Sequence, residues 1–300
     1  MYLTDILDAL FTIFYPAKKP QVSLKPSDVD SLSDEEIEEL MTTASRFIDG
    51  VPGTVAKLIH NWLGKDTVDC SEANVSQIVF KKTTIPIPRV RRVIKSKGIY
   101  IIVMDYIQDS NLAEVWPTYS LWQKIRVAFT LRRYVRQLRW VEAPLGTLPG
   151  PLSEQGPQAC DVSSIFGRIR PRRGPFNSYK ELSDFFNYRY GLGWKAILPE
   201  DHPIMKATFD DSSPLVITHN DLNPRNIIVG EDGRIWVVNW AWSGYYPPWF
   251  EYSAMTNQVE NEQLGGWYDR SWELAIPFVC GPNFQQHEWL GRAGLGLDYT

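Results

Sequence analysis

The sequence lacks three features that would each assign it to a class of protein: paired cysteines, an excess of positive charge and a long hydrophobic run. Its 300 residues include three widely spaced cysteines, Cys70, Cys160 and Cys280, which suit neither a disulfide framework nor a zinc site. Lysine and arginine number 31 against 35 aspartates and glutamates, a formal net charge of −4, so nucleic acid is not an expected partner. The longest uninterrupted apolar run beyond residue 15 is Ile99–Met104, far below the roughly 20 residues that span a bilayer. A cytoplasmic protein without a membrane or nucleic-acid partner is therefore expected.

Residues 1–32 are predicted to form an N-terminal helix and a linker. The apolar start is interrupted by Asp5 and Asp8 and has no positive region before it, so we expect an amphipathic helix rather than a secretory signal. Residues 16–33 mix proline, lysine and serine without apolar periodicity, which is typical of a linker. Ser33 is followed three residues later by Glu36, a capping box that predicts the start of a helix.

Residues 33–108 are predicted to form a small antiparallel sheet with one helix. Thr54–Ile59 is a short apolar stretch, and Ser71–Lys82 carries apolar residues at helical spacing. Val90–Ile94 and Gly98–Ile107 are typical of two strands joined by a tight turn.

Residues 109–300 are predicted to form a larger and mainly helical part. Leu121–Trp140 and Tyr179–Tyr190 have amphipathic helical patterns. Residues 146–174 are rich in glycine, proline and serine, and a segment of that length is expected to be a functional loop or flap. Short strands are predicted at Leu215–Thr218, Asn226–Val229 and Arg234–Trp240.

The most informative segment runs from Thr218 to Val229. Asp221 and Asn226 stand five positions apart in it and lead into a predicted strand. A carboxylate at the first position can accept a hydroxyl proton, and an amide oxygen at the second can bind a metal on phosphates. Asp221 is therefore predicted to be the catalytic base and Asn226 a metal ligand. His219 is interpreted as a residue that positions the loop backbone.

This segment resembles the catalytic loop of the aminoglycoside phosphotransferase and choline kinase-like family, and most closely of its fungal branch. The stretches 83–90 and 100–107 are also similar to the sheet and hinge segments of that family. The resemblance implies an α+β, two-lobed protein kinase-like fold, with a small, truncated antiparallel-sheet N-lobe at 33–108 and a larger helical C-lobe at 109–300. It also implies transfer of the γ-phosphoryl group of ATP to a hydroxyl of a small molecule, with Mg²⁺.

The resemblance places the nucleotide against the N-lobe. The backbone of Met104, Asp105 and Tyr106 would hold the adenine edge. Lys57 would neutralise the phosphates, held by Glu72, although Lys65 is an alternative to Lys57. The sheet before either lysine is too short for a full glycine-rich loop, for which only residues 50–53 are available.

Two further positions bear on activity. Asn239 stands where the family has the aspartate that bridges the metal and the phosphates, and an amide is a poorer ligand than a carboxylate for a hard dication. Asn239 is therefore predicted to be a weakened metal ligand in a slow phosphotransferase. The alternative is an inactive kinase-like protein, a pseudokinase, with a binding or regulatory role. Glu251 lies on the acceptor side in the family and is a candidate substrate contact, or else a carboxylate at a helix N-terminus. Neither the acceptor nor the oligomeric state is specified.

Overall fold

The computed structural model divides into two compact units. The first comprises residues 1–115, 153–156 and 224–240, and the second 116–152, 157–223 and 241–300. The structure describes residues 26–43, 54–59, 70–96, 99–107, 109–195, 197–199, 201–230, 232–264 and 268–298. The predicted N-terminal helix, Lys65 and the glycines at 50–53 lie outside these residues.

The first unit is built on a three-stranded antiparallel sheet. Its strand order is β1 (Thr54–Ile59), β3 (Ile99–Asp105) and β2 (Val90–Ser96), with β3 in the centre. Successive side chains of a strand point to opposite faces, so β3 contributes to two separate cores. Tyr100 and Ile102 pack with Ala73 of α3 (Ser71–Lys82), which covers one face.

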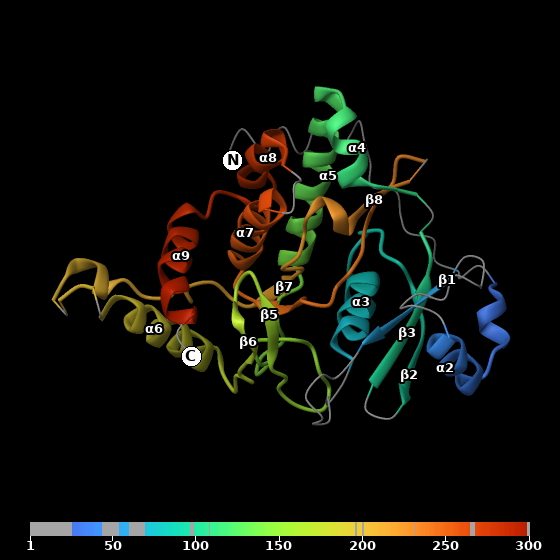
Figure 1. Cartoon of the computed structure of the whole chain (residues 1–300), viewed down its shortest axis with the longest axis horizontal. Helices are drawn as coiled ribbons and strands as arrows, with labels where there is room; N and C mark the ends of the chain where they lie inside the picture. The colour runs from blue at the N-terminus through green and yellow to red at the C-terminus, as the bar shows by residue number, and fades with distance from the viewer. Residues whose placement is uncertain are drawn as a thin grey trace. The chain divides into compact units, whose positions relative to one another are not determined.

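The opposite face of this sheet is covered by the segment that precedes β1. Ile101 and Val103 pack there against Val29 and Ile37, which belong to the 3₁₀ helix η1 (Asp28–Ser31) and the helix α2 (Asp34–Thr43). Figure 1 shows α2 and α3 on opposite sides of the sheet. The predicted capping box is confirmed, because the Glu36 backbone N–H donates to Ser33 Oγ at 3.2 Å and the Ser33 N–H donates to Glu36 Oε2 at 2.7 Å.

A second small sheet of the first unit carries the residues that follow the predicted catalytic loop. It comprises β4 (Ser110–Asn111), β8 (Ile227–Val229) and β9 (Ile235–Val237) in that order, all antiparallel. The helix α4 (Leu112–Val115) follows β4, and the 3₁₀ turn η4 (Pro224–Asn226) precedes β8. The N–H of Val237 donates to the carbonyl of Pro86 at 2.9 Å, which ties this sheet to the segment before β2.

The second unit is mainly helical. Its helices are η2 (Trp116–Thr118), α5 (Leu121–Arg139), α6 (Tyr179–Lys195), η3 (Pro203–Lys206), α7 (Phe250–Leu264), α8 (Arg270–Cys280) and α9 (Phe284–Asp298). Two antiparallel strand pairs accompany them, β5 (Cys160–Ser163) with β6 (Gly167–Arg173) and β7 (Val216–Thr218) with β10 (Gly244–Tyr246). The expectation of one long loop over 146–174 was wrong in part, because its second half is the β5–β6 hairpin.

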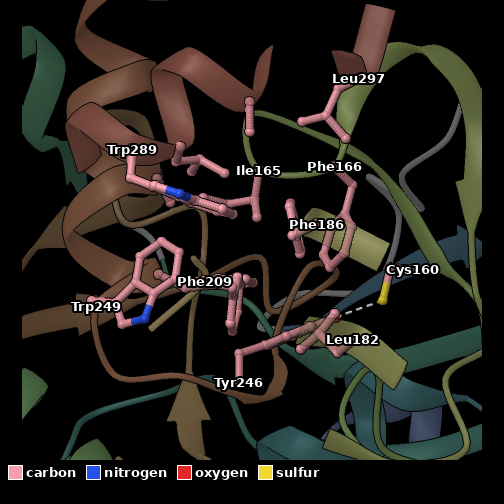
Figure 2. Packing of buried hydrophobic residues seen from close by; sticks show 14 of the residues in the cluster. Cys160, Ile165, Phe166, Leu182, Phe186, Phe209, Tyr246, Trp249, Trp289 and Leu297 are labelled. Atoms are coloured by element: carbon pink, nitrogen blue, oxygen red, sulfur yellow. Dashed lines mark hydrogen bonds between the residues drawn. The ribbon is translucent and has the colours of Figure 1, made fainter. Parts of the chain in front are cut away.

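The core of the second unit is rich in aromatic rings (Figure 2). Phe186 of α6 stacks on Phe209 with ring centroids 5.3 Å apart, and Tyr190 stacks on Trp289 of α9 at 5.0 Å. Trp249 and Tyr246 are 3% and 2% exposed, so these two members of the aromatic run 236–249 fill the core. They anchor the start of α7, the helix that contacts the predicted catalytic loop through Glu251.

The structure agrees with the expected α+β class, a small antiparallel sheet followed by a mainly helical part. Residues 224–240 group with the first unit rather than the second, so the contacts do not follow a single boundary along the chain. Among the described residues, no helix is both long enough and apolar enough to cross a membrane.

Candidate functional site

Asp221 lies in the loop after β7 and is held by two side-chain amides. Its side chain is buried, with the residue 7% exposed. Asn223 Nδ2 donates to Asp221 Oδ1 at 2.8 Å, and Gln258 Nε2 of α7 donates to the same oxygen at 2.5 Å. Two donors on one oxygen favour the ionised carboxylate and restrict its rotation. An ionised, oriented carboxylate is what a general base requires.

The backbone of the loop is fixed at His219, which is completely buried. Its N–H donates to Glu251 Oε2 at 2.6 Å, and its carbonyl accepts from Ser243 Oγ at 3.1 Å. Its Nδ1 accepts from the N–H of Asp221 at 3.2 Å. These bonds support the positioning role predicted for His219.

Glu251, at the start of α7, is 2% exposed and accepts a hydrogen bond from the loop that carries Asp221. Burial raises the pKa of its carboxyl to about 7, while hydrogen bonds from the His219 and Asn220 backbone and the charge of Arg139 oppose that rise. Through the hydrogen bond from the His219 N–H, the Glu251 carboxyl group holds the loop that carries Asp221. Direct contact between Glu251 and an acceptor stays a prediction.

Asn226 and Asn239, the two candidate metal ligands, lie together in the first unit. Asn239 Nδ2 donates to Asn226 Oδ1 at 3.3 Å, and the Val238 N–H donates to the Asn226 carbonyl at 3.0 Å. Asn239 has φ 64°, a left-handed conformation that asparagine tolerates better than most residues. The turn after β9 therefore aims the amide of Asn239 at Asn226.

This pair does not match the ligand set that Mg²⁺ prefers. The ion is usually bound by one or two carboxylates together with phosphates and water, whereas positions 226 and 239 both offer amides. The oxygen that Asn226 would present to a metal already accepts a hydrogen bond from Asn239. Within the described residues there is no group of three or more His, Cys, Asp or Glu side chains that could hold a metal ion.

The three predicted adenine-binding positions differ in what their backbone already does. Met104 and Asp105 belong to β3, where Met104 pairs with both Val55 and Val90. The Asp105 N–H donates to the carbonyl of Arg89 at 3.0 Å, and its carboxylate accepts from Arg91 Nε at 2.7 Å. Tyr106 follows the strand and is 54% exposed. Tyr106 is thus the position of the three that lies beyond the paired strand.

Lys57 and Glu72 belong to elements associated with the same strand. The register of the sheet pairs Lys57 with Ile102, and Ile102 packs with Ala73, the neighbour of Glu72 in α3. Glu72 is 4% exposed. The side chain of Lys57 lies outside the described part of the structure, so its pairing with Glu72 stays a prediction.

The structure thus brings together Asn226 with Asn239, and Glu251 with the loop of Asp221. Sequence reasoning missed Gln258 and gave no role to Asn223. A neutral amide carries no charge signal and occurs in many surface helices, so nothing in the sequence indicated Gln258. Asn223 stands two residues after the candidate base, and an asparagine side chain often forms hydrogen bonds with groups nearby in sequence. Its contact with Asp221 could therefore have been predicted from its position.

Comparison with known proteins gives a family match. Residues 83–277 match the model of the phosphotransferase enzyme family. A search of the curated proteins finds no significant match. Among solved structures, the aminoglycoside phosphotransferase APH(3'')-Id from Streptomyces rimosus, in complex with ADP and streptomycin, is 14% identical, with 90% of this chain and 100% of that one covered and a TM-score of 0.45.

Two other similar structures are a spectinomycin phosphotransferase and a viral kinase. APH(9)-Ia, in complex with ADP and spectinomycin, is 14% identical over 84% of this chain and 80% of that one, with a TM-score of 0.43. The Cydia pomonella granulovirus kinase PK-1 is 12% identical over 89% of this chain and 93% of that one, with a TM-score of 0.35.

Proposed function

Because this chain belongs to the phosphotransferase enzyme family, we propose that it transfers the γ-phosphoryl group of ATP to a hydroxyl of a small molecule, at a reduced rate. The observation that carries this proposal is the state of Asp221, a buried carboxylate held by the amides of Asn223 and Gln258. A loop kept only for structure would not need an oriented charge at this position.

Asp221 acts as the general base of the proposed reaction. The acceptor oxygen attacks the γ-phosphorus, the bond from that phosphorus to the oxygen shared with the β-phosphate breaks, and ADP leaves. The acceptor hydroxyl proton passes to the Asp221 carboxylate. Such a base contributes about 10²- to 10⁴-fold to the rate, and the rest comes from positioning and charge neutralisation.

The nucleotide side of the proposal uses the first unit. The backbone near Met104, Asp105 and Tyr106 would hold adenine, and Tyr106 is favoured because it follows the paired strand. Lys57 would contact the phosphates with Glu72 as its partner. Magnesium would be bound largely by the nucleotide's own phosphates, since the amides of Asn226 and Asn239 are poor ligands, and the reduced rate is attributed to this weakness.

The acceptor class stays open, because acceptor pockets in such enzymes are built from loops that vary with substrate. The test panel should include aminoglycosides, choline and simple sugars. We propose a cytoplasmic protein that acts on small molecules without nucleic acid, on the basis of its charge and cysteine content.

The first test compares the parent with Asp221→Asn. An amide cannot accept the hydroxyl proton although it keeps the shape of the carboxylate, so ADP formation with ATP, Mg²⁺ and the acceptor panel should fall by about 100-fold or more. Matched melting temperatures are the control for folding. Equal rates for the two proteins would show that Asp221 is not the base.

A second candidate function, a nucleotide-binding protein without turnover, is favoured by one observation. The hydrogen bond from Asn239 to Asn226 stabilises the pair without a metal. Under this alternative the chain binds ATP and forms no ADP, and binding is equal with and without Mg²⁺. A titration of nucleotide with magnesium and with EDTA separates the two functions.

A further inference from the structure

Gln258 connects the second unit's helix α7 to the candidate base. It is 6% exposed, and its Nε2 donates to Asp221 Oδ1 at 2.5 Å. Its Oε1 accepts from Asn261 Nδ2 at 2.6 Å. Because the amide oxygen of Gln258 is held by a donor, its nitrogen is turned toward Asp221. Asn261 thus determines which end of the Gln258 amide faces the carboxylate.

The same helix holds the loop at a second point. Glu251 and Gln258 are seven residues apart, two turns of an α-helix, and therefore lie on one face. Glu251 binds the backbone N–H of His219, and Gln258 binds the carboxylate two residues further along the loop. One rigid helix therefore fixes both the path of the loop and the direction of its charged side chain.

From this geometry we infer that Gln258 is a positioning residue for the phosphoryl-transfer reaction, and that it orients the Asp221 carboxylate. The inference rests on the proposed function for its catalytic meaning. Asn223, the other donor to Oδ1, belongs to the same loop as Asp221 and moves with it. Gln258 is the donor that belongs to a separate element, so it can hold the carboxylate against motion of the loop.

The test replaces Gln258 with methionine, which has a similar length and no donor. The matched control is Asn257→Met, because Asn257 is the adjacent residue of α7 and its Nδ2 donates at 2.7 Å to the carbonyl of Ser164, away from the loop. A second variant, Asn261→Leu, removes the group that orients the Gln258 amide. It should show a weaker form of the same effects.

The first readout does not depend on turnover. In protein labelled with ¹³C at aspartate carboxyl carbons, the Asp221 resonance is assigned by its loss in Asp221→Asn. Removal of one donor to a carboxylate favours its protonated form, so the resonance should titrate at higher pH in Gln258→Met than in the parent. Glu251, whose carboxyl interacts electrostatically with Asp221, is present in both proteins. The titration should be unchanged in Asn257→Met. An unchanged midpoint in Gln258→Met would overturn the inference.

The second readout is kinetic. With ATP and any acceptor that the parent turns over, Gln258→Met should lower kcat by about 10- to 100-fold with the KM for ATP changed less than about 2-fold. The acid limb of its pH–rate profile should move to higher pH. Equal losses in Gln258→Met and Asn257→Met would contradict a positioning role. If the parent forms no product while the carboxyl titration still moves, the proposed function fails and the orienting contact stands.

Discussion

Asn239 and Asn226 differ from a metal-binding pair because an N–H donor, rather than a cation, faces the side-chain oxygen of Asn226. Asn239 presents its Nδ2 to Asn226 Oδ1 at 3.3 Å, so the oxygen that would face a cation faces a donor instead. An aspartate at position 239 has no donor to offer. Its charge would repel the Asn226 oxygen unless a cation lay between them, so the residue at 239 decides whether this pair requires a metal.

Asn239→Asp should therefore make the site metal-dependent. Without Mg²⁺ the variant loses the amide contact and should be destabilised by about 1 kcal/mol. With Mg²⁺ it should bind an ATP analogue about 10-fold more tightly than the parent, because a hard cation prefers a carboxylate ligand. Calorimetric titration of the analogue, with Mg²⁺ and with EDTA, measures the affinity, and denaturant unfolding without Mg²⁺ measures the stability.

The control is Asn239→Gly, which tolerates φ 64° and removes the hydrogen bond without adding charge. It should show the loss of stability and no gain in affinity. If Asn239→Asp binds the analogue no more tightly with Mg²⁺ than the glycine variant does, position 239 is not a metal position.

Glu251 predicts a pH dependence of stability. Its pKa is raised from 4.5 to about 7, chiefly by burial, so between these values the folded chain keeps a proton that the unfolded chain loses. Its contribution to the unfolding free energy is therefore complete below pH 4.5 and is lost as the pH rises to about 7.

Glu251→Gln removes this titration. The melting temperature of the variant relative to the parent should rise between pH 5 and pH 8, whatever the constant offset caused by the altered hydrogen bonds. The exposed Glu114→Gln is the control and should follow the parent at all pH values. Parallel curves for Glu251→Gln and the parent would show that Glu251 does not titrate in this range.

At the scale of elements, the segment Asp28–Thr43 supports the central strand of the first unit. Arg91 joins the two, since its Nη1 lies 2.8 Å from Asp30 Oδ2 and its Nε lies 2.7 Å from Asp105 Oδ1. The Arg91 side chain is 5% exposed. The end of β3, where adenine is proposed to bind, is therefore fixed by an ion pair that reaches across to η1.

Arg91→Met should release this segment. The hydrogen bonds of a guanidinium to carboxylates contribute on the order of 1–3 kcal/mol, so amide hydrogen exchange in Asp28–Thr43 and Ile99–Asp105 should accelerate by about 10-fold or more. Lys95→Met, on the same strand with an exposed side chain, is the control. Exchange that is equally slow in both variants would mean that apolar packing alone holds the segment.

The elements with strong local patterns were predictable. The helix Ser71–Lys82 was predicted with the bounds that the structure has, and both strands after it were placed within two residues. The helix η1 was missed because residues 16–33 have no periodic pattern, although Val29 is buried against β3. The β5–β6 hairpin was missed because the stretch just before it, 146–159, is rich in proline and glycine, which is typical of loops.

The residues of the candidate site were predictable where their charge and their spacing in the sequence indicated a role. Asp221 and Asn226 were found from their separation, whereas Gln258 is 37 residues from Asp221 in sequence, so only tertiary packing brings them together. The burial of Glu251 could not be predicted from the sequence either, since a carboxylate early in a helix is usually exposed.

At the scale of the whole molecule, the family and the loop support the same activity. The family match spans residues 83–277 and includes both Asp221 and Asn239, so the match alone does not decide between turnover and binding. Membership of the fungal branch stays a prediction. Turnover is distinguished from binding alone by whether the γ-phosphoryl group of ATP is transferred to a hydroxyl oxygen of an acceptor.

The most direct measurement follows the γ-phosphate itself by ³¹P NMR in a mixture of the protein, ATP, Mg²⁺ and the hydroxyl panel. For a slow phosphotransferase, the γ-resonance of ATP should decline slowly, ADP and a new phosphomonoester resonance should appear in equal amounts, and Asp221→Asn should prevent both. The contrary result is a protein that is stabilised thermally by ATP, as mass action requires of a bound ligand, and that leaves the ATP spectrum unchanged over days with every acceptor.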